Sequence, residues 1–157
     1  MSPTRTVTDV DVELSKADQD DPDVEGLVAL LLVDIAVRYQ SDEPEPPLGP
    51  SAGFLLARRD GVAVGCVAVQ DLGPGVGEVK RMYVVEHERG RGVGRLLLAG
   101  AEELARERGY TRLRLETGDM QPEAVALYAS SGWHRIEPYG YWKDEPGVIC
   151  FEKQLVG

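Results

Sequence analysis

Apolar residues along this chain recur at two spacings, one typical of helices and the other of strands. Between Val24 and Ile35 they recur every three or four residues, and Asp21-Pro22 before them is a frequent helix start. We therefore expect a helix of about five turns that ends near Tyr39. The same spacing predicts a helix from Val93 to Arg108 and a short helix that opens at Pro122 and closes near Gly132.

Alternating apolar residues between these helices predict strands. The runs Phe54–Ala57 and Val62–Val69 flank a turn that ends in Asp60-Gly61, a pattern typical of a β-hairpin. Residues 40–52 form a proline-rich loop, because prolines interrupt both helices and central strands. The whole pattern predicts one mixed α/β domain over residues 1–157. Further strands are expected over residues 5–14, 79–85, 111–117, 133–136 and 148–155.

Composition narrows the function classes. The net charge of −10 argues against general nucleic-acid binding, and no apolar run approaches the roughly 18 residues that a membrane span needs. We expect a cytoplasmic protein, since the N-terminus lacks the apolar segment of a signal peptide and the strand-like runs around Cys66 and Cys150 indicate buried free thiols. With no Cys-x-x-Cys and only two histidines, no metal is expected.

The segment Arg89-Gly90-Arg91-Gly92-Val93-Gly94-Arg95 carries the strongest chemical signal. It joins a predicted strand to a predicted helix, and its glycines leave room for backbone N–H groups to converge where the helix presents unpaired first-turn donors. Such an arrangement favours phosphate. The segment lacks the Lys-Ser/Thr of a Walker loop and the third glycine of a dinucleotide fingerprint. A turn that merely connects strand to helix would leave the three arginines unexplained.

Two segments of the chain resemble signatures of the GNAT N-acetyltransferase superfamily. Arg89-x-x-Gly92-x-Gly94 is similar to its Gln/Arg-x-x-Gly-x-Gly/Ala loop, which holds the pyrophosphate of acetyl-CoA. Ala124-x3-Tyr128-x3-Gly132-Trp133 is similar to its Asn-x-x-Ala-x3-Tyr-x3-Gly-Phe segment, with Gln121 at the Asn position and Trp133 at the Phe position. The resemblance implies a single GNAT-like α/β (α+β) domain, with a central mixed, mostly antiparallel sheet of about six to seven strands flanked by helices.

The resemblance also implies acetyl-CoA as co-substrate and no metal. In this family the loop amides hold the pyrophosphate, and the pantetheine arm pairs as an extra strand with the backbone of the strand before the loop. A backbone amide of that strand faces the thioester oxygen, and loop arginines add charge for the phosphates. The cofactor-binding residues implied are Met82, Tyr83, Val84, Arg89, Gly90, Arg91, Gly92, Val93, Gly94, Arg95 and Gln121.

Direct acetyl transfer to an amine needs a base for the amine and an acid for the departing thiolate. Glu78 lies eleven residues before Arg89, the interval seen for the catalytic glutamate of histone-acetyltransferase members, and is the first candidate for the base. Glu116, on the neighbouring predicted strand, is the second. Tyr128 matches the family tyrosine that points at the sulfur, and its pKa of about 10 suits a proton donor. The alternatives are a surface glutamate at position 78 and a core tyrosine at position 128.

We expect an acetyl-CoA-dependent N-acetyltransferase acting on a primary amine of a small molecule, in a family with many homodimers. A non-catalytic acyl-CoA-binding module and transfer to a hydroxyl group remain alternatives. The acceptor pocket is expected between the first helix, the proline-rich loop and Tyr139–Trp142. Eight acidic residues between Asp9 and Glu25 face only Lys16, which indicates either a solvated surface or attraction for a cationic amine. The aromatic residues indicate an apolar or aromatic acceptor instead.

Overall fold

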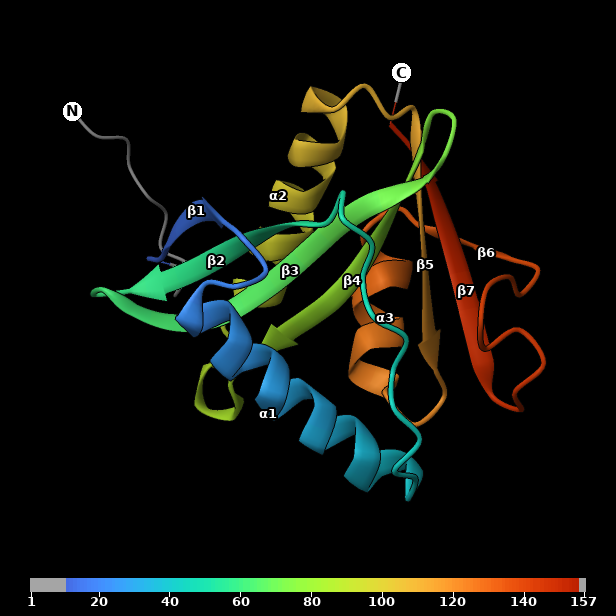
Figure 1. Ribbon diagram of the computed structural model, residues 1–157, viewed down its shortest axis with the longest axis horizontal. Helices are drawn as coiled ribbons and strands as arrows, with labels where there is room; N and C mark the ends of the chain where they lie inside the picture. Colours follow the sequence, from blue (N-terminus) through green and yellow to red (C-terminus); the bar gives the residue numbers. More distant parts are fainter. Residues whose placement is uncertain (1–10, 156–157) are drawn as a thin grey trace.

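The computed structural model describes residues 11–155, in which three α-helices pack against one seven-stranded sheet (Figure 1). The strand order is β1-β2-β3-β4-β5-β7-β6, and only β4 and β5 pair in parallel. This confirms the predicted mixed, mostly antiparallel sheet flanked by helices. In chain order the elements are β1 (Glu13–Ala17), α1 (Pro22–Tyr39), β2 (Gly53–Arg59), β3 (Val62–Gly73), β4 (Val76–Val84), a 3-10 turn (Glu86–Glu88), α2 (Val93–Glu107), β5 (Arg112–Gly118), α3 (Pro122–Ser130), β6 (His134–Ile136) and β7 (Val148–Gln154).

The first strand differs from its prediction over residues 5–14. Residues 5–10 lie outside the described residues, and β1 runs over Glu13–Ala17. Its position is set by antiparallel pairing with β2, where Glu13 faces Arg58 and Ala17 faces Phe54. The weak alternation used for the prediction does not report this pairing, because the partner strand lies about forty residues further along the chain.

The local signals at α1 and at the β2–β3 hairpin are confirmed. The Asp21 side chain caps α1 by accepting a hydrogen bond from the Asp23 backbone N–H at 2.8 Å. The hairpin turns at Asp60 and Gly61, whose φ angles of 52° and 82° are the left-handed values that a two-residue turn requires. Among residues 11–155, no helix is long and apolar enough to cross a membrane.

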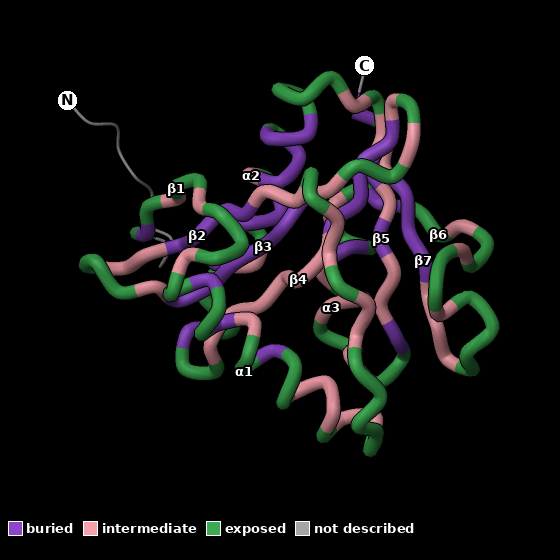
Figure 2. Tube along the Cα trace, in the orientation of Figure 1, coloured by how far each residue is buried: buried purple, intermediate pink, exposed green. Residues whose placement is uncertain are grey.

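Both faces of the sheet are buried near its centre (Figure 2). Along β2, Phe54 and Leu56 pack in a cluster with α1, whereas Leu55 and Ala57 pack in the larger cluster that contains residues of α2 and α3. The alternation of β2 therefore places α1 on one face of the sheet and α2 and α3 on the other. The cysteines Cys66 and Cys150 are free and buried, as predicted, and burial raises the pKa of Cys66 to about 12.

β4 and β5 begin as neighbours and then separate. Their parallel pairing covers only three residue pairs and ends at Glu78 and Arg114. Beyond that point β4 stays paired with β3, and β5 pairs with β7 as far as Gly118. The β3–β4 register also shifts between Lys80 and Tyr83, where Arg81 has a φ of 55°. The result is an opening between β4 and β5 in the middle of the sheet.

Candidate active site

The opening between β4 and β5 leads into a cavity of about 650 Å³. Its walls come from the C-terminal half of α1, residues 41–45 of the proline-rich loop, residues 79–82 of β4 and residues 116–118 of β5. The loop residues 142 and 145–147, the first residue of β7, and residues 121 and 128 complete them. The predicted surroundings of the acceptor pocket are thus present around one cavity. Of the predicted Tyr139–Trp142 segment, Trp142 lines it and Tyr139 does not.

The glycine-rich segment forms the turn between β4 and α2. Gly90 and Gly92 have φ angles of 78° and 90°, which favour glycine, and α2 begins at Val93. No side chain caps the first turn of α2 at Gly92, so its first backbone N–H groups are left for another partner. The conformation therefore presents the backbone donors that an anion at a helix N-terminus requires.

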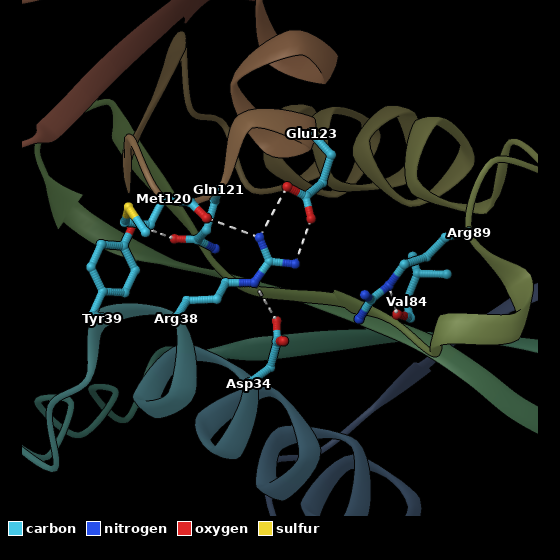
Figure 3. A network of polar contacts seen from close by, with 8 residues as sticks. All are labelled: Asp34, Arg38, Tyr39, Val84, Arg89, Met120, Gln121 and Glu123. Atoms are coloured by element: carbon cyan, nitrogen blue, oxygen red, sulfur yellow. Dashed lines mark hydrogen bonds and ion pairs between the residues drawn. The ribbon is translucent and has the colours of Figure 1, made fainter.

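The three arginines of this segment contact the protein itself. The Arg89 Nε–H donates to the Val84 carbonyl oxygen at 2.9 Å (Figure 3). The Arg89 guanidinium also lies 5.4 Å from the centre of the Tyr83 ring. Arg91 lies 3.5 Å from Glu88, and Arg95 donates to the hydroxyl oxygens of Ser130 and Ser131 at 3.0 and 3.2 Å. Because each guanidinium already has a protein partner, the backbone is the more available feature for phosphate.

A partly buried ion pair between Arg59 and Glu88 lies next to the glycine-rich segment, where Glu88 also contacts Arg91. Glu88 is 3% exposed and accepts two hydrogen bonds from Arg59, at 2.9 and 3.0 Å. These hydrogen bonds lower the pKa of Glu88, so its carboxylate stays charged. The sequence analysis missed this pair, because Arg59 lies in the β2–β3 hairpin and nothing in the local sequence of Glu88 indicates that partner.

Glu78, the first candidate for the base, is buried and fully engaged. It is 5% exposed and accepts hydrogen bonds from Gln70 Nε2 at 3.1 Å and from the Tyr139 hydroxyl at 2.7 Å. Burial and the neighbouring carboxylate raise the pKa of Tyr139, which keeps its hydroxyl protonated as a donor. Glu78 does not line the cavity, so an acceptor there would not reach it without rearrangement.

Glu116, the second candidate, lines the cavity and has an unoccupied oxygen. Its side chain is 6% exposed, and its Oε1 lies 3.6 Å from the Lys80 Nζ. Within residues 11–155 its buried Oε2 has no hydrogen-bond partner. Burial raises the pKa of Glu116, with the nearby Glu78 carboxylate adding to the shift and Lys80 opposing it. A buried carboxylate with a raised pKa and a free oxygen is suited to accept a proton.

Tyr128 combines a core ring with a place in the cavity wall. Its ring packs against Trp133 and Phe151, with centroids 6.0 and 5.8 Å apart, and the residue also lines the cavity. In the described part of the chain its hydroxyl has no hydrogen-bond partner, and burial raises its pKa to about 12. The hydroxyl is therefore a neutral donor at physiological pH. The sequence analysis gave core packing and a place in the site as alternatives for Tyr128, and the structure shows the ring in the core and the residue in the cavity wall.

Side chains of α1 and α3 join across the opening between β4 and β5 (Figure 3). Arg38 of α1 forms a two-point ion pair with Glu123 of α3 and donates to the Met120 carbonyl oxygen at 3.0 Å. The neighbouring Tyr39 hydroxyl donates to Gln121 Oε1 at 3.2 Å. Gln121, which stands at the family's Asn position, lines the cavity and uses this oxygen to hold α1. Sequence reasoning found Gln121 but not Arg38.

Comparison with known proteins adds independent findings. The family model for the acetyltransferase (GNAT) family matches residues 28–133. An IAA acetyltransferase of Azospirillum brasilense is 43% identical over 68% of this chain and 70% of its own length. An uncharacterized N-acetyltransferase of Schizosaccharomyces pombe is 36% identical over 94% of this chain and 96% of its own length. A Klebsiella pneumoniae structure named for acyl-CoA N-acyltransferase activity aligns with a TM-score of 0.81 at 32% identity, covering 94% of this chain and 99% of that one.

Proposed function

The chain belongs to the acetyltransferase (GNAT) family and is an acyltransferase, and from this premise we propose that it transfers an acetyl group from acetyl-CoA directly to a primary amine. The acceptor is a small molecule that binds in the cavity between β4 and β5. One observation carries the proposal: the buried Oε2 of Glu116, which has no hydrogen-bond partner within residues 11–155, lies in the same cavity wall as the hydroxyl-bearing Tyr128. The two groups supply the base and the acid that aminolysis of a thioester needs.

The glycine-rich segment is proposed to hold the pyrophosphate of acetyl-CoA. The uncapped first turn of α2 and the left-handed Gly90 and Gly92 support this assignment. From there the pantetheine arm runs along β4, whose backbone beyond Glu78 is not paired with β5. The Val84 carbonyl, which accepts from Arg89, becomes available to the arm when that side chain turns toward the phosphates.

The proposed step moves one acyl group and two protons. The neutral amine nitrogen attacks the thioester carbonyl carbon, so that a C–N bond forms and the C–S bond breaks. Glu116 takes the proton that the nitrogen loses, and Tyr128 gives a proton to the departing sulfur. Solvent then returns both side chains to their starting protonation states. Glu78 contributes without contacting the acceptor. Its charge raises the pKa of Glu116, and its carboxylate oxygens accept hydrogen bonds from Gln70 and Tyr139 and so hold both side chains in place.

The proposal is tested by thiol release. Purified protein is mixed with acetyl-CoA and a panel of primary amines, and free CoA thiol is measured against a no-amine control. We expect release with at least one amine and formation of its N-acetyl product in equal amount. Binding of acetyl-CoA without release on any amine would favour a non-catalytic acyl-CoA-binding module. Release with alcohols alone would move the activity to hydroxyl acceptors.

A further inference from the structure

The cavity wall has acidic groups that no cation in the wall balances. Two cationic side chains line the cavity, Lys80 and Arg81, and each is already paired inside it. Lys80 lies 3.6 Å from Glu116, and Arg81 lies 3.8 Å from Glu45. Arg81 also donates to the Pro46 carbonyl oxygen at 2.8 Å. These partners occupy both cations, so neither is free to receive an anionic group of a ligand.

Three further carboxylates line the same cavity without a cationic partner. They are Asp42, Glu43 and Glu145, from the proline-rich loop and the loop before β7. Glu43 accepts a hydrogen bond from the neutral Tyr141 hydroxyl at 2.9 Å, which leaves its charge uncompensated. Within residues 11–155 no ion pair involves any of these three side chains. The mouth of the cavity therefore carries a net negative charge.

Glu116, deeper in the cavity, offers a binding position for the cationic group of a ligand. The Oε2 atom of Glu116 is buried in the described structure with no hydrogen-bond partner, although its side chain is only 6% exposed. A buried carboxylate oxygen without a donor is costly, and a ligand N–H would satisfy it. The apolar part of such a ligand would contact apolar wall residues, which are Leu31 and Ile35 of α1 and Trp142.

From these contacts, and resting on the proposed function, we propose that the acceptor is an amine with an apolar or aromatic body and no carboxylate. It enters as an ammonium ion along Asp42, Glu43 and Glu145, and its nitrogen reaches Oε2 of Glu116. There the ammonium ion releases one proton to solvent, which gives the neutral amine that attacks the thioester. An amino acid carries its carboxylate two bonds from the nitrogen, so it would bring a negative charge into the same acidic cavity, beside Glu116, where Lys80 is already paired. The cavity charge, rather than its shape, then excludes amino-acid acceptors.

The experiment compares phenethylamine with phenylalanine, which differ by one carboxylate group. The dissociation constant of each is measured by calorimetry on protein saturated with CoA, at low ionic strength. We expect phenethylamine to bind at least about tenfold more tightly than phenylalanine. The triple variant Asp42→Asn, Glu43→Gln, Glu145→Gln is expected to bring the two affinities to within about threefold. Asp144→Asn removes one negative charge, as each substitution of the triple variant does, from a neighbouring side chain that is 92% exposed and does not line the cavity, and it should leave the ratio unchanged.

Binding and turnover separate this inference from the proposed function. Equal or tighter binding of phenylalanine, or a ratio that the triple variant does not change, would overturn the inference whatever the turnover. If phenethylamine is selected in binding but no thiol is released from acetyl-CoA with any amine, the charge selection stands and the proposed function fails. Release of thiol with phenethylamine and its decline in the triple variant would support both.

Discussion

The two binding regions proposed beside β4 are built in different ways. The glycine-rich segment follows the C-terminal end of β4. It consists of seven consecutive residues whose backbone conformation presents N–H donors. Beside the middle of β4, the cavity is assembled from α1, the proline-rich loop, β5 and the loop before β7, and side chains give it its charge. A backbone site is fixed by local conformation, whereas a side-chain site exists only once distant segments have packed. The following substitutions test this contrast.

The largest expected effect separates two carboxylates on adjacent strands. Glu116→Gln keeps the shape of the side chain but removes the base, so kcat should fall by about 100-fold or more while the affinity for acetyl-CoA stays the same. Glu78→Gln is the matched control, because Glu78 is buried but does not line the cavity. We expect it to lower kcat by less than about tenfold. Steady-state kinetics with a saturating amine measures kcat for both variants. An equal fall in kcat would contradict the assignment of Glu116, and not Glu78, as the base.

The glycine-rich segment can be tested by matched glycine substitutions. Gly90 and Gly109 have φ angles of 78° and 84°, and an added Cβ would meet nothing within 4 Å at either position. Alanine should therefore destabilise the fold by a similar amount at each, about 1 kcal/mol. Only Gly90→Ala is expected to weaken acetyl-CoA binding, by about tenfold, because it disturbs the backbone donors. Calorimetric titration with CoA measures the affinity of both variants. Equal affinities would show that the glycine-rich segment does not bind the cofactor.

Removal of one hydroxyl tests the acid without disturbing the core. Tyr128→Phe keeps the ring that packs against Trp133 and Phe151. Turnover should fall by about tenfold, since the thiolate would leave without its proton donor, and acetyl-CoA affinity should be nearly unchanged. A more acidic thiol leaves more readily without a proton donor. A thioester of such a thiol should therefore reduce the difference in turnover between the unmodified protein and Tyr128→Phe. An undiminished rate with acetyl-CoA itself would exclude Tyr128 from the mechanism.

The smallest expected effect concerns the ion pair between α1 and α3. Arg38 forms two hydrogen bonds to Glu123, one to a backbone carbonyl and one to Asp34 of its own helix, and its side chain is 22% exposed. Arg38→Met should lower the free energy of unfolding by about 1 kcal/mol. Lys16→Met breaks the more exposed Lys16–Glu107 pair and should change it by less than about 0.5 kcal/mol. Urea unfolding compares them, and equal losses would show that the bridge across the opening is an ordinary surface contact.

The sequence predicted much of the fold because its signals are local. Asp21-Pro22 at the start of α1 and Asp60-Gly61 in the hairpin act through hydrogen bonds and φ angles of a few neighbouring residues. β1 shifted from its predicted position because strand pairing is a long-range property. For the candidate site, the glycine-rich segment was singled out from its own glycines and arginines, whereas Gln121 and Tyr128 were named through resemblance to family motifs.

Side-chain environments could not be predicted in the same way. Glu78 and Glu116 were both named as candidates, and only their neighbours in space distinguish them: Gln70 and Tyr139 occupy the first, whereas one oxygen of the second has no partner within residues 11–155. The acidic residues up to Glu25 that the structure describes do not line the cavity. The cavity is lined by the other end of α1, and its carboxylates come from residues 42–45, 116 and 145.

The pH dependence of kcat tests the central role of Glu116 most directly. Its burial raises its pKa above the ordinary value of about 4.3, and only the carboxylate form can accept a proton. The rate of the unmodified protein should therefore fall as the pH drops through that raised pKa, separately from the titration of the amine at higher pH. We predict that Glu116→Gln loses this acidic limb and that Glu78→Gln keeps it. An acidic limb that survives in Glu116→Gln, or disappears in Glu78→Gln, would contradict the assignment.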